Sequence, residues 1–147
     1  MIIEVGENEL HAAAEIHSAS WKASHRAFCK ADFIERHTPE QQAIYLRQEM
    51  ASGKKVYLLV ETRPVGIVSV INSLIENLYI LPDEQHRGYG TKLLQFALQK
   101  CDGTPTLWIL DNNTQAYSLY TKYGFTKTGV FHQLSPEIAE IEMKQKG

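Results

Sequence analysis

The alternation of apolar and polar residues along the chain predicts a succession of short strands and amphipathic helices. Strands are expected where apolar residues alternate or run continuously, and helices where they recur three and four positions apart. The expected strands are residues 2–5, 55–61, 64–71, 74–81, 104–110, 125–131 and 137–145, and the expected helices are residues 7–25, 39–51, 113–123 and the segment before Gly103 that carries Leu93, Leu94 and Ala97. This order indicates one α+β domain over residues 1–147.

Local signals refine several of these elements. Thr38 and Pro39 are residue types preferred at the start of a helix, so they mark the beginning of the second one. Residues 74–81 are apolar on both faces apart from Glu76 and Asn77, which predicts a central strand covered by helices on both sides.

The N-terminal part of the chain is less regular. The first helix carries an apolar stripe that ends at Trp21, which we expect to pack in the core, and His17 interrupts the stripe at its polar edge. Residues 26–38 show no clear period and predict irregular structure.

Composition and charge narrow the function classes. The chain is 44% hydrophobic with a formal charge of -2, which is ordinary for a globular domain and argues against a general nucleic-acid binder. No apolar stretch approaches a membrane span and the first residues lack the features of a signal peptide, so we expect a cytoplasmic protein that does not act at membranes. Cys29 and Cys101 are far apart and are expected to be reduced thiols, and the six histidines show no metal-ligand spacing.

The stretch "EQHRGYGTKLL", residues 84–94, places two glycines at the start of a predicted helix. The first N–H groups of a helix lack internal partners and the helix dipole adds positive potential, so an anion such as phosphate can bind there. Gly88 and Gly90 carry no side chain to keep a phosphate away, and Arg87 can add a charge contact. On spacing alone, a tight strand-to-helix turn without a ligand is the alternative. The P-loop and GxGxxG patterns are both missing, which argues against a nucleotide site.

Three segments together resemble one known family. The hexapeptide "QHRGYG", residues 85–90, resembles the Q/R-x-x-G-x-G/A motif of the GNAT superfamily of acyl-CoA-dependent N-acyltransferases. Residues 113–125 resemble its second signature, N-x-x-A-x-x-x-Y-x-x-x-GF, and "ENLYILP" is similar to its NLYVxP strand. The match covers about a third of the chain, residues 76–125. It implies a single GNAT-type domain with a mixed central sheet of about six to seven strands flanked by about four helices.

The resemblance also implies acetyl-CoA as co-substrate and no metal. The glycine loop would hold the pyrophosphate of coenzyme A through backbone N–H groups, and the strand 74–81 would pair with the pantetheine arm after parting from the strand 104–110. The cofactor-binding residues implied by position are Ile80, Leu81, Gln85, His86, Arg87, Gly88, Tyr89, Gly90, Thr91, Asn113 and Tyr120.

Acetyl transfer needs a neutral amine, and an ordinary lysine-like amine with a pKa near 10.4 costs roughly 4 to 5 kcal/mol to deprotonate at pH 7. Glu76 is the carboxylate of the central strand, and strand parity predicts that it shares a face with Leu74, Leu78 and Ile80. Glu76 is therefore a candidate base, although relatives that use a glutamate often carry it two residues earlier, where this chain has Leu74. The alternative is a carboxylate that is solvated at a cleft mouth or paired with a cation.

Two further catalytic roles follow from the resemblance. The backbone N–H of Leu78 would stabilise the oxyanion of the tetrahedral intermediate. Tyr120 occupies the general-acid position that protonates the leaving thiolate, with a space-filling core tyrosine as the alternative. His25 and His132 could line the acceptor site, since the N-terminal helices and the last hairpin frame it in this fold. Trp21 and Phe28 could form a wall of the same site, which is the alternative to core packing for Trp21.

The function expected from the sequence is transfer of an acetyl group from acetyl-CoA to a primary amine by direct attack in a ternary complex. The acceptor would be a small molecule or a peptide. The resemblance also suggests a homodimer, because members of the family often form one. A noncatalytic acyl-CoA-binding or sensing domain is the first alternative, and a nucleotide phosphate-binding domain is the second.

Overall fold

The sheet order places β4 at the centre of the molecule. The computed structural model describes residues 1–26 and 29–146, and its seven strands lie in the order β1-β2-β3-β4-β5-β7-β6. Neighbouring strands are antiparallel except for β4 and β5, which are parallel. The strands are β1 (Ile2–Glu4), β2 (Lys55–Val60), β3 (Pro64–Ile71), β4 (Leu74–Ile80), β5 (Thr106–Leu110), β6 (Phe125–Gln133) and β7 (Ala139–Gln145). The mixed sheet expected from the sequence is confirmed.

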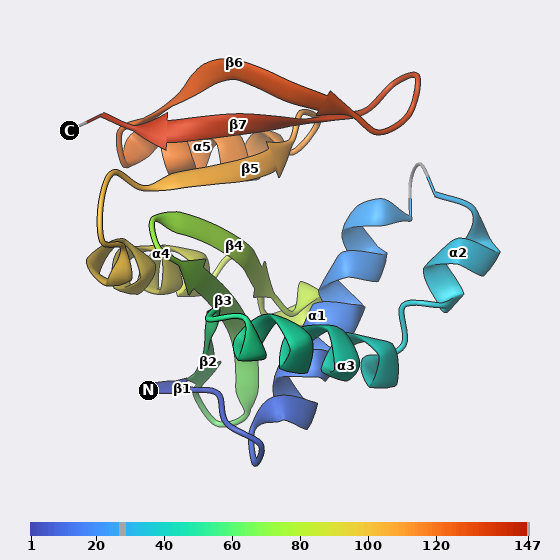
Figure 1. Cartoon of the computed structure of the whole chain (residues 1–147). Helices are drawn as coiled ribbons and strands as arrows, with labels where there is room; N and C mark the ends of the chain where they lie inside the picture. Colours follow the sequence, from blue (N-terminus) through green and yellow to red (C-terminus); the bar gives the residue numbers. More distant parts are fainter. Residues whose placement is uncertain (27–28, 147) are drawn as a thin grey trace.

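Helices cover both faces of this sheet (Figure 1). Helices α4 and α5 pack against one face of the sheet, in a hydrophobic cluster that includes fully buried residues such as Leu93, Leu94 and Phe125. Helices α1 and α3 pack against the opposite face in a second cluster, which includes Ala13, Ala14 and Leu46. The helices are α1 (Leu10–His25), α2 (Ala31–Glu35), α3 (Pro39–Ala51), α4 (Tyr89–Lys100) and α5 (Thr114–Lys122), with a 3-10 turn η1 (Pro82–Glu84) before α4.

The ends of α3 follow the predicted signals. The hydroxyl of Thr38 accepts a hydrogen bond from the backbone N–H of Gln41 at 3.2 Å, and Pro39 occupies the first helical position. The short helix α2 was not predicted, because its five residues lie in the stretch that lacks a periodic pattern. That stretch also includes residues 27–28, which fall outside the described residues.

β4 and β5 separate after two residue pairs, and this separation creates the site. Only Leu74 with Thr106 and Ile75 with Leu107 are paired in register. Beyond Ile75 the two strands diverge, as the resemblance had implied (Figure 1).

A β-bulge at Asn77 overturns the strand-parity prediction for Glu76. Asn77 has a positive φ of 54°, and the β3–β4 register shifts at this point, so an extra residue of β4 lies opposite β3. Glu76 therefore reaches Lys54 on the α3 face, whereas Leu78 and Ile80 pack into the cluster on the α4 face. The predicted common face with Leu78 and Ile80 is wrong, because period-two alternation ends at a bulge.

Candidate active site

Two cavities meet in the gap between β4 and β5. The larger has a volume of about 670 Å³ and lies between β4, β5, α1 and α3, and we call it the wide cavity. The smaller has a volume of about 250 Å³ and lies against the residue 84–91 loop, and we call it the loop cavity. The residues that line both are Leu78, Asn113, Ala116 and Tyr120. The two cavities therefore join where the central strands part.

The loop cavity contains most of the cofactor-binding residues expected from the sequence. Those that line it are Ile80, Gln85, His86, Gly88, Tyr89, Gly90, Thr91, Asn113 and Tyr120. Leu81 and Arg87 do not line it. Leu81 packs against the cluster on the α1 face and its N–H donates to the carbonyl of Val65, while Arg87 pairs with Glu84 at 3.4 Å.

The geometry of the loop leaves helix N–H groups facing this cavity. Gly88 is the N-cap of α4 with a φ of 83°, a left-handed conformation that costs side-chain-bearing residues energy, and His86 also has a positive φ of 67°. Within residues 1–26 and 29–146 no side chain caps α4, and the N–H groups of its first turn have no partner within the helix. The side chain of Gln85 donates to the carbonyl of Ile80 at 3.4 Å and ties the loop to the end of β4.

Helix α5 brings Asn113 and Tyr120 to the junction of the cavities. The Asn113 Oδ1 atom accepts from the backbone N–H of Ala116 at 3.0 Å, so its role is first a helix cap, and the Nδ2 group is left to face the cavities. Tyr120 is 7% exposed, and burial raises its pKa to about 12. Its hydroxyl has no hydrogen-bond partner among the described residues, so Tyr120 stays protonated and able to donate at neutral pH.

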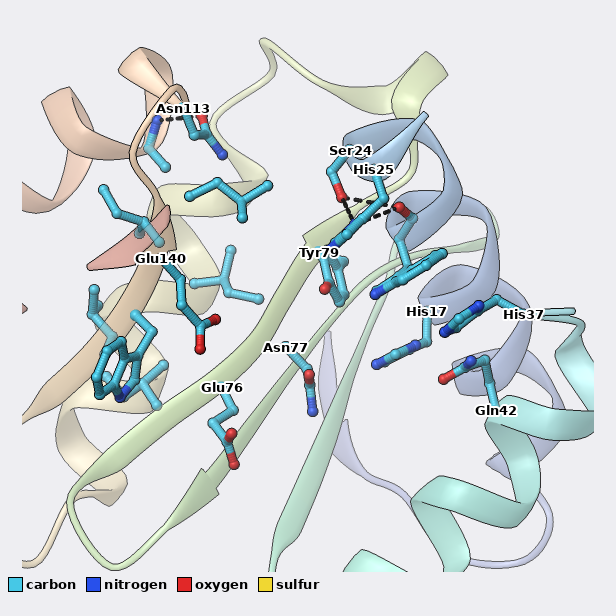
Figure 2. A pocket seen from close by; sticks show the side chains of 18 of the residues that line it. His17, Ser24, His25, His37, Gln42, Glu76, Asn77, Tyr79, Asn113 and Glu140 are labelled. Atoms are coloured by element: carbon cyan, nitrogen blue, oxygen red, sulfur yellow. Dashed lines mark hydrogen bonds between the residues drawn. The ribbon is translucent and has the colours of Figure 1, made fainter. Parts of the chain in front are cut away.

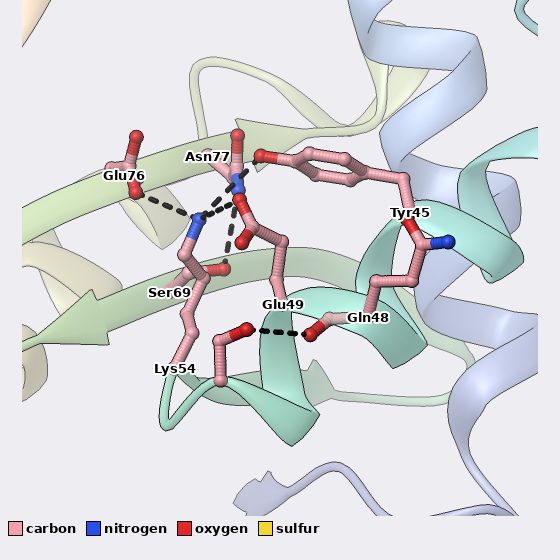
Figure 3. A network of polar contacts seen from close by, with 8 residues as sticks. Tyr45, Gln48, Glu49, Lys54, Ser69, Glu76 and Asn77 are labelled. Atoms are coloured by element: carbon pink, nitrogen blue, oxygen red, sulfur yellow. Dashed lines mark hydrogen bonds and ion pairs between the residues drawn. The ribbon is translucent and has the colours of Figure 1, made fainter.

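Glu76 lines the wide cavity but is held by a buried cation. The Lys54 Nζ atom lies 2.7 Å from Glu76 and 3.1 Å from Glu49, and it also donates to the Tyr45 hydroxyl at 3.5 Å (Figure 3). The Lys54 side chain is only 3% exposed, whereas the two carboxylates are about one-third exposed. Burial alone would lower the pKa of Lys54, but Glu76, Tyr45 and Glu49 outweigh it and raise that pKa. The cation-paired alternative for Glu76 is the arrangement observed.

Aromatic side chains from α1 and the α2–α3 region form the opposite wall of the wide cavity. The indole of Trp21 is stacked between His25, with ring centroids 4.0 Å apart, and His37, at 3.4 Å. Trp21 lines the cavity and is in neither core cluster, so its alternative place in the wall is the one observed and the expectation of core packing is wrong. Phe28, the other residue considered for this wall, lies outside the described residues. The two histidines of this stack, His25 and His37, line the same wall of the wide cavity (Figure 2).

His17 is buried in the same wall and not at the polar edge of its helix, as the sequence had suggested. The residue is 5% exposed and contacts the rings of Tyr45 and Tyr79, and its Nδ1 atom has no hydrogen-bond partner among the residues that the structure describes. Burial lowers the pKa of His17 to about 4, so the ring is neutral at pH 7.

The strand β7 contributes a carboxylate that the sequence did not single out. Glu140 lines the wide cavity and extends into the gap beside β5 (Figure 2). His132 was expected near the acceptor site; it does not line the cavity itself, but its Nδ1 atom lies 3.1 Å from Glu140. His25, the other histidine proposed for this region, lines the cavity. Only the register of the last hairpin, which pairs His132 with Glu140, could have pointed to the carboxylate.

The described residues contain no group of three or more His, Cys, Asp or Glu side chains arranged to hold a metal ion. Within residues 1–26 and 29–146, none of the helices combines the length and apolar character needed to cross a bilayer. Cys29 and Cys101 are free and half-buried.

Comparison with known proteins identifies the class. A family model described as an acetyltransferase (GNAT) domain matches residues 52–127. The peptidyl-lysine N-acetyltransferase YjaB of Salmonella typhimurium is 35% identical over 69 residues, which are 47% of this chain and 47% of that protein. The aligned segment thus spans about half the length of this curated relative.

Solved structures show the same fold over the whole chain. The PaiA N-acetyltransferase of Thermoplasma acidophilum in complex with coenzyme A has a TM-score of 0.73 at 18% identity, covering 100% of this chain and 98% of that one. Apo YjaB of Escherichia coli has a TM-score of 0.73 at 22% identity, covering 100% and 97%. The structure of yncA from Salmonella typhimurium with its cofactor acetyl-CoA has a TM-score of 0.72 at 18% identity, covering 99% and 92%.

The family model spans more than half of the chain, and the chain belongs to the GNAT family of acetyltransferases. Acetyl-CoA is the co-substrate of this family.

Proposed function

We propose that residues 1–147 form one domain that transfers the acetyl group of acetyl-CoA to a primary amine by direct attack in a ternary complex. The observation that carries this proposal is the junction of the two cavities between β4 and β5. A cofactor that enters through the loop cavity meets an acceptor from the wide cavity there, beside Leu78 and Tyr120.

The loop cavity suits the phosphate end of coenzyme A. The uncapped N–H groups at the start of α4, with Gly88 in a left-handed conformation, are donors at the positive end of a helix dipole. The neighbouring His86 side chain is held by Gln115, whose Nε2 atom lies 3.4 Å from its Nδ1 atom. We propose that these backbone groups bind the pyrophosphate, and that the edge of β4 from Leu78 to Ile80 lies along the pantetheine arm.

The residues at the junction supply two further functions in this proposal. The backbone N–H of Leu78, which follows the bulge at Asn77, stabilises the oxyanion of the tetrahedral intermediate. The Tyr120 hydroxyl donates a proton to the sulfur of the departing thiolate. Because burial raises the pKa of Tyr120 above that of an ordinary thiol, the donation is completed as the amine nitrogen gives up its own second proton.

The base is not assigned to Glu76. Its carboxylate lies 2.7 Å from the buried Lys54 ammonium and is the partner of that cation, so it is not available to an acceptor amine. Lys54 in turn remains stable in a nearly solvent-free position only while its carboxylate partners are ionised. In this proposal Glu76 has a structural role: it holds the buried Lys54 ammonium in the cavity wall.

Thiol release from acetyl-CoA tests the proposed reaction. The acceptors are polyamines, aminoglycosides, amino acids, and peptides with a free N-terminus or a lysine, the last because the relative YjaB is named for peptidyl-lysine acetylation. Calorimetric titration of coenzyme A accompanies the assay. Turnover with one acceptor class supports the enzyme, whereas coenzyme binding without turnover favours the sensing alternative and absence of binding removes the proposal.

Replacement of Tyr120 tests the assigned acid. Tyr120→Phe should lower kcat by about 10²-fold and leave the affinity for coenzyme A nearly unchanged, because only the donor to sulfur is lost. Tyr117→Phe is the matched control, since Tyr117 lies on the same helix but is 40% exposed. An unchanged kcat in Tyr120→Phe would leave Tyr120 with a packing role only.

A further inference from the structure

Glu140 is the carboxylate that faces the point where an acceptor amine would arrive. On β7, Met143 and Ile141 point into the core on the α4 face, so alternation turns Glu140 to the opposite face, toward α1. It pairs in register with Leu110 of β5, beyond the point where β4 leaves β5. Figure 2 shows its carboxylate extending into the gap between the strands.

The other carboxylates near this face are already engaged. Glu76 is bound to Lys54, and Glu142, two residues from Glu140 on the same strand, accepts a hydrogen bond from the Thr128 hydroxyl at 2.8 Å and does not line the cavity. The Glu140 side chain is 37% exposed, and the atom within 4 Å that can carry a positive charge is the Nδ1 of His132 at 3.1 Å. Among the described residues, Glu140 is therefore the cavity carboxylate without a permanently charged partner.

The charge of Glu140 acts across the whole cavity. Burial lowers the pKa of His25 on α1, and the negative charge of Glu140 opposes that effect. The same charge contributes to the raised pKa of Tyr79 on β4, after burial as the main cause. A cationic group in the cavity is therefore attracted to Glu140 whether it lies near α1 or near β4.

His132 positions Glu140 from the solvent side. Its ring is stacked on Trp108 with centroids 4.6 Å apart and planes 13° from parallel, which fixes the direction of its Nδ1 atom. The His132 and Glu140 side chains are 61% and 37% exposed, so a proton accepted by the Glu140 carboxylate can leave to water at this edge of the cavity. Glu140 thus has both an orienting partner and a path for the proton to leave.

We infer that Glu140 binds the ammonium form of the acceptor and accepts its first proton, and that the acceptor is accordingly a cationic primary amine. This inference rests on the proposed acetyl transfer. One N–H proton passes to Glu140, the nitrogen lone pair forms the bond to the thioester carbonyl carbon, and the C–S bond breaks with its electron pair on sulfur. The thiolate receives a proton through Tyr120, which regains one from the second N–H of the amine. The products are the amide, coenzyme A thiol and one proton released from Glu140 to water.

Several other titratable groups face the same space. Those that line the wide cavity with Glu140 or contact it are His132 from β6, Glu76 and Tyr79 from β4, His17 and His25 from α1, Arg36 and His37 from the α2–α3 region, Tyr45 from α3 and Tyr120 from α5. Lys54 and Asp32 neutralise Glu76 and Arg36 respectively. The test must therefore separate the titration of Glu140 from that of its neighbours.

The pH dependence of Glu140→Gln makes this separation, with Glu142→Gln as the matched control on the same strand. With spermidine or a lysine peptide, both cationic at pH 7, Glu140→Gln should lower the rate by about 10² to 10³-fold. The variant's rate should then rise tenfold per pH unit toward the amine pKa of about 10.4, because the neutral fraction of the amine rises with pH. With methoxyamine, which is neutral at pH 7, the variant and the wild type should differ by less than about threefold.

The outcomes are distinguishable. An equal defect with cationic and neutral amines, or a full rate in Glu140→Gln, overturns the role of Glu140 and leaves the proposed function intact. No thiol release by the wild type with any amine removes the proposed function and this inference with it. His132→Phe keeps the ring stack but loses Nδ1, and it should change the pH profile in the same direction to a smaller extent. Calorimetry with coenzyme A checks that each variant is folded.

Discussion

The buried ammonium of Lys54 should make two carboxylates on different elements interdependent. Lys54 is 3% exposed and contacts Glu76 of β4 at 2.7 Å and Glu49 of α3 at 3.1 Å (Figure 3). The perturbation is replacement of each carboxylate by its isosteric amide, singly and together. Each single variant leaves one carboxylate beside the ammonium, and the double variant leaves none, so the two effects on stability should not add.

The magnitude follows from the kind of bond that each variant retains. A hydrogen bond to a charged group contributes about 1.5 to 3 kcal/mol and a neutral one about 0.5 to 1.5 kcal/mol, so each single replacement should cost about 1 kcal/mol. A buried charge left without any compensating opposite charge costs about 3 to 5 kcal/mol, and the double variant, which keeps only neutral hydrogen-bond partners, should lose about that much. The coupling between Glu49 and Glu76 is then about 1 to 3 kcal/mol.

Urea and thermal unfolding of the four proteins at pH 7 measure this coupling. Each single variant should lower Tm by about 2 to 4 °C, given the size of the chain. Because the pKa of Lys54 is raised above its ordinary value of 10.5, its stabilisation is fully present below that pH and is lost as pH rises through the higher folded-state value. Additive losses in the double variant, or a coupling that disappears between pH 7 and 9, would refute the reasoning.

Three further predictions concern other parts of the molecule. Burial lowers the pKa of His17 to about 4, so between pH 6.5 and 4 the unfolded chain binds a proton that the folded protein does not. The free energy of unfolding should therefore fall by about 3 kcal/mol as pH drops through this window, and an NMR titration midpoint near 6.5 for the His17 ring would contradict this. Gly88→Ala forces a φ of 83° on alanine, and stability should fall by about 1 to 2 kcal/mol and coenzyme A should bind more weakly by calorimetry, whereas an unchanged Kd would count against the loop site. Gly66→Ala would bring a Cβ atom within 2.6 Å of the Ile80 Cδ1 atom, so urea unfolding should show a loss of about 1 to 3 kcal/mol, and a neutral result would mean that β4 yields easily.

The sequence predicted the parts of the fold and site that depend on local patterns. Periodicity and caps located α3 from Pro39 to Ala51, and the family motifs located the loop at Gly88 and the helix that carries Tyr120. These features depend on residues that are close together in the sequence, so sequence patterns can predict them. The separation of β4 from β5 followed from the family resemblance and is present in the structure.

The rest depended on contacts between distant segments. The bulge at Asn77 places Glu76 and Leu78 on opposite faces of the sheet, and a period-two pattern in the sequence does not predict a bulge. The partner of Glu76, Lys54, is separated from it in sequence and sits in a run of two lysines that looks like a solvated surface. His17 was assigned to a polar edge because a helical wheel does not show that α3 and Tyr79 cover that edge.

The most direct test of the central claim is a titration of the isotopically labelled protein with coenzyme A, followed by amide NMR. The account predicts shifts concentrated at His86, at residues 88–91, and at Leu78, Ile80 and Asn113, which line the loop cavity and its junction with the wide cavity. Shifts confined to other surfaces, or no shifts at saturating coenzyme A, would contradict the assignment of the gap between β4 and β5 as the cofactor site.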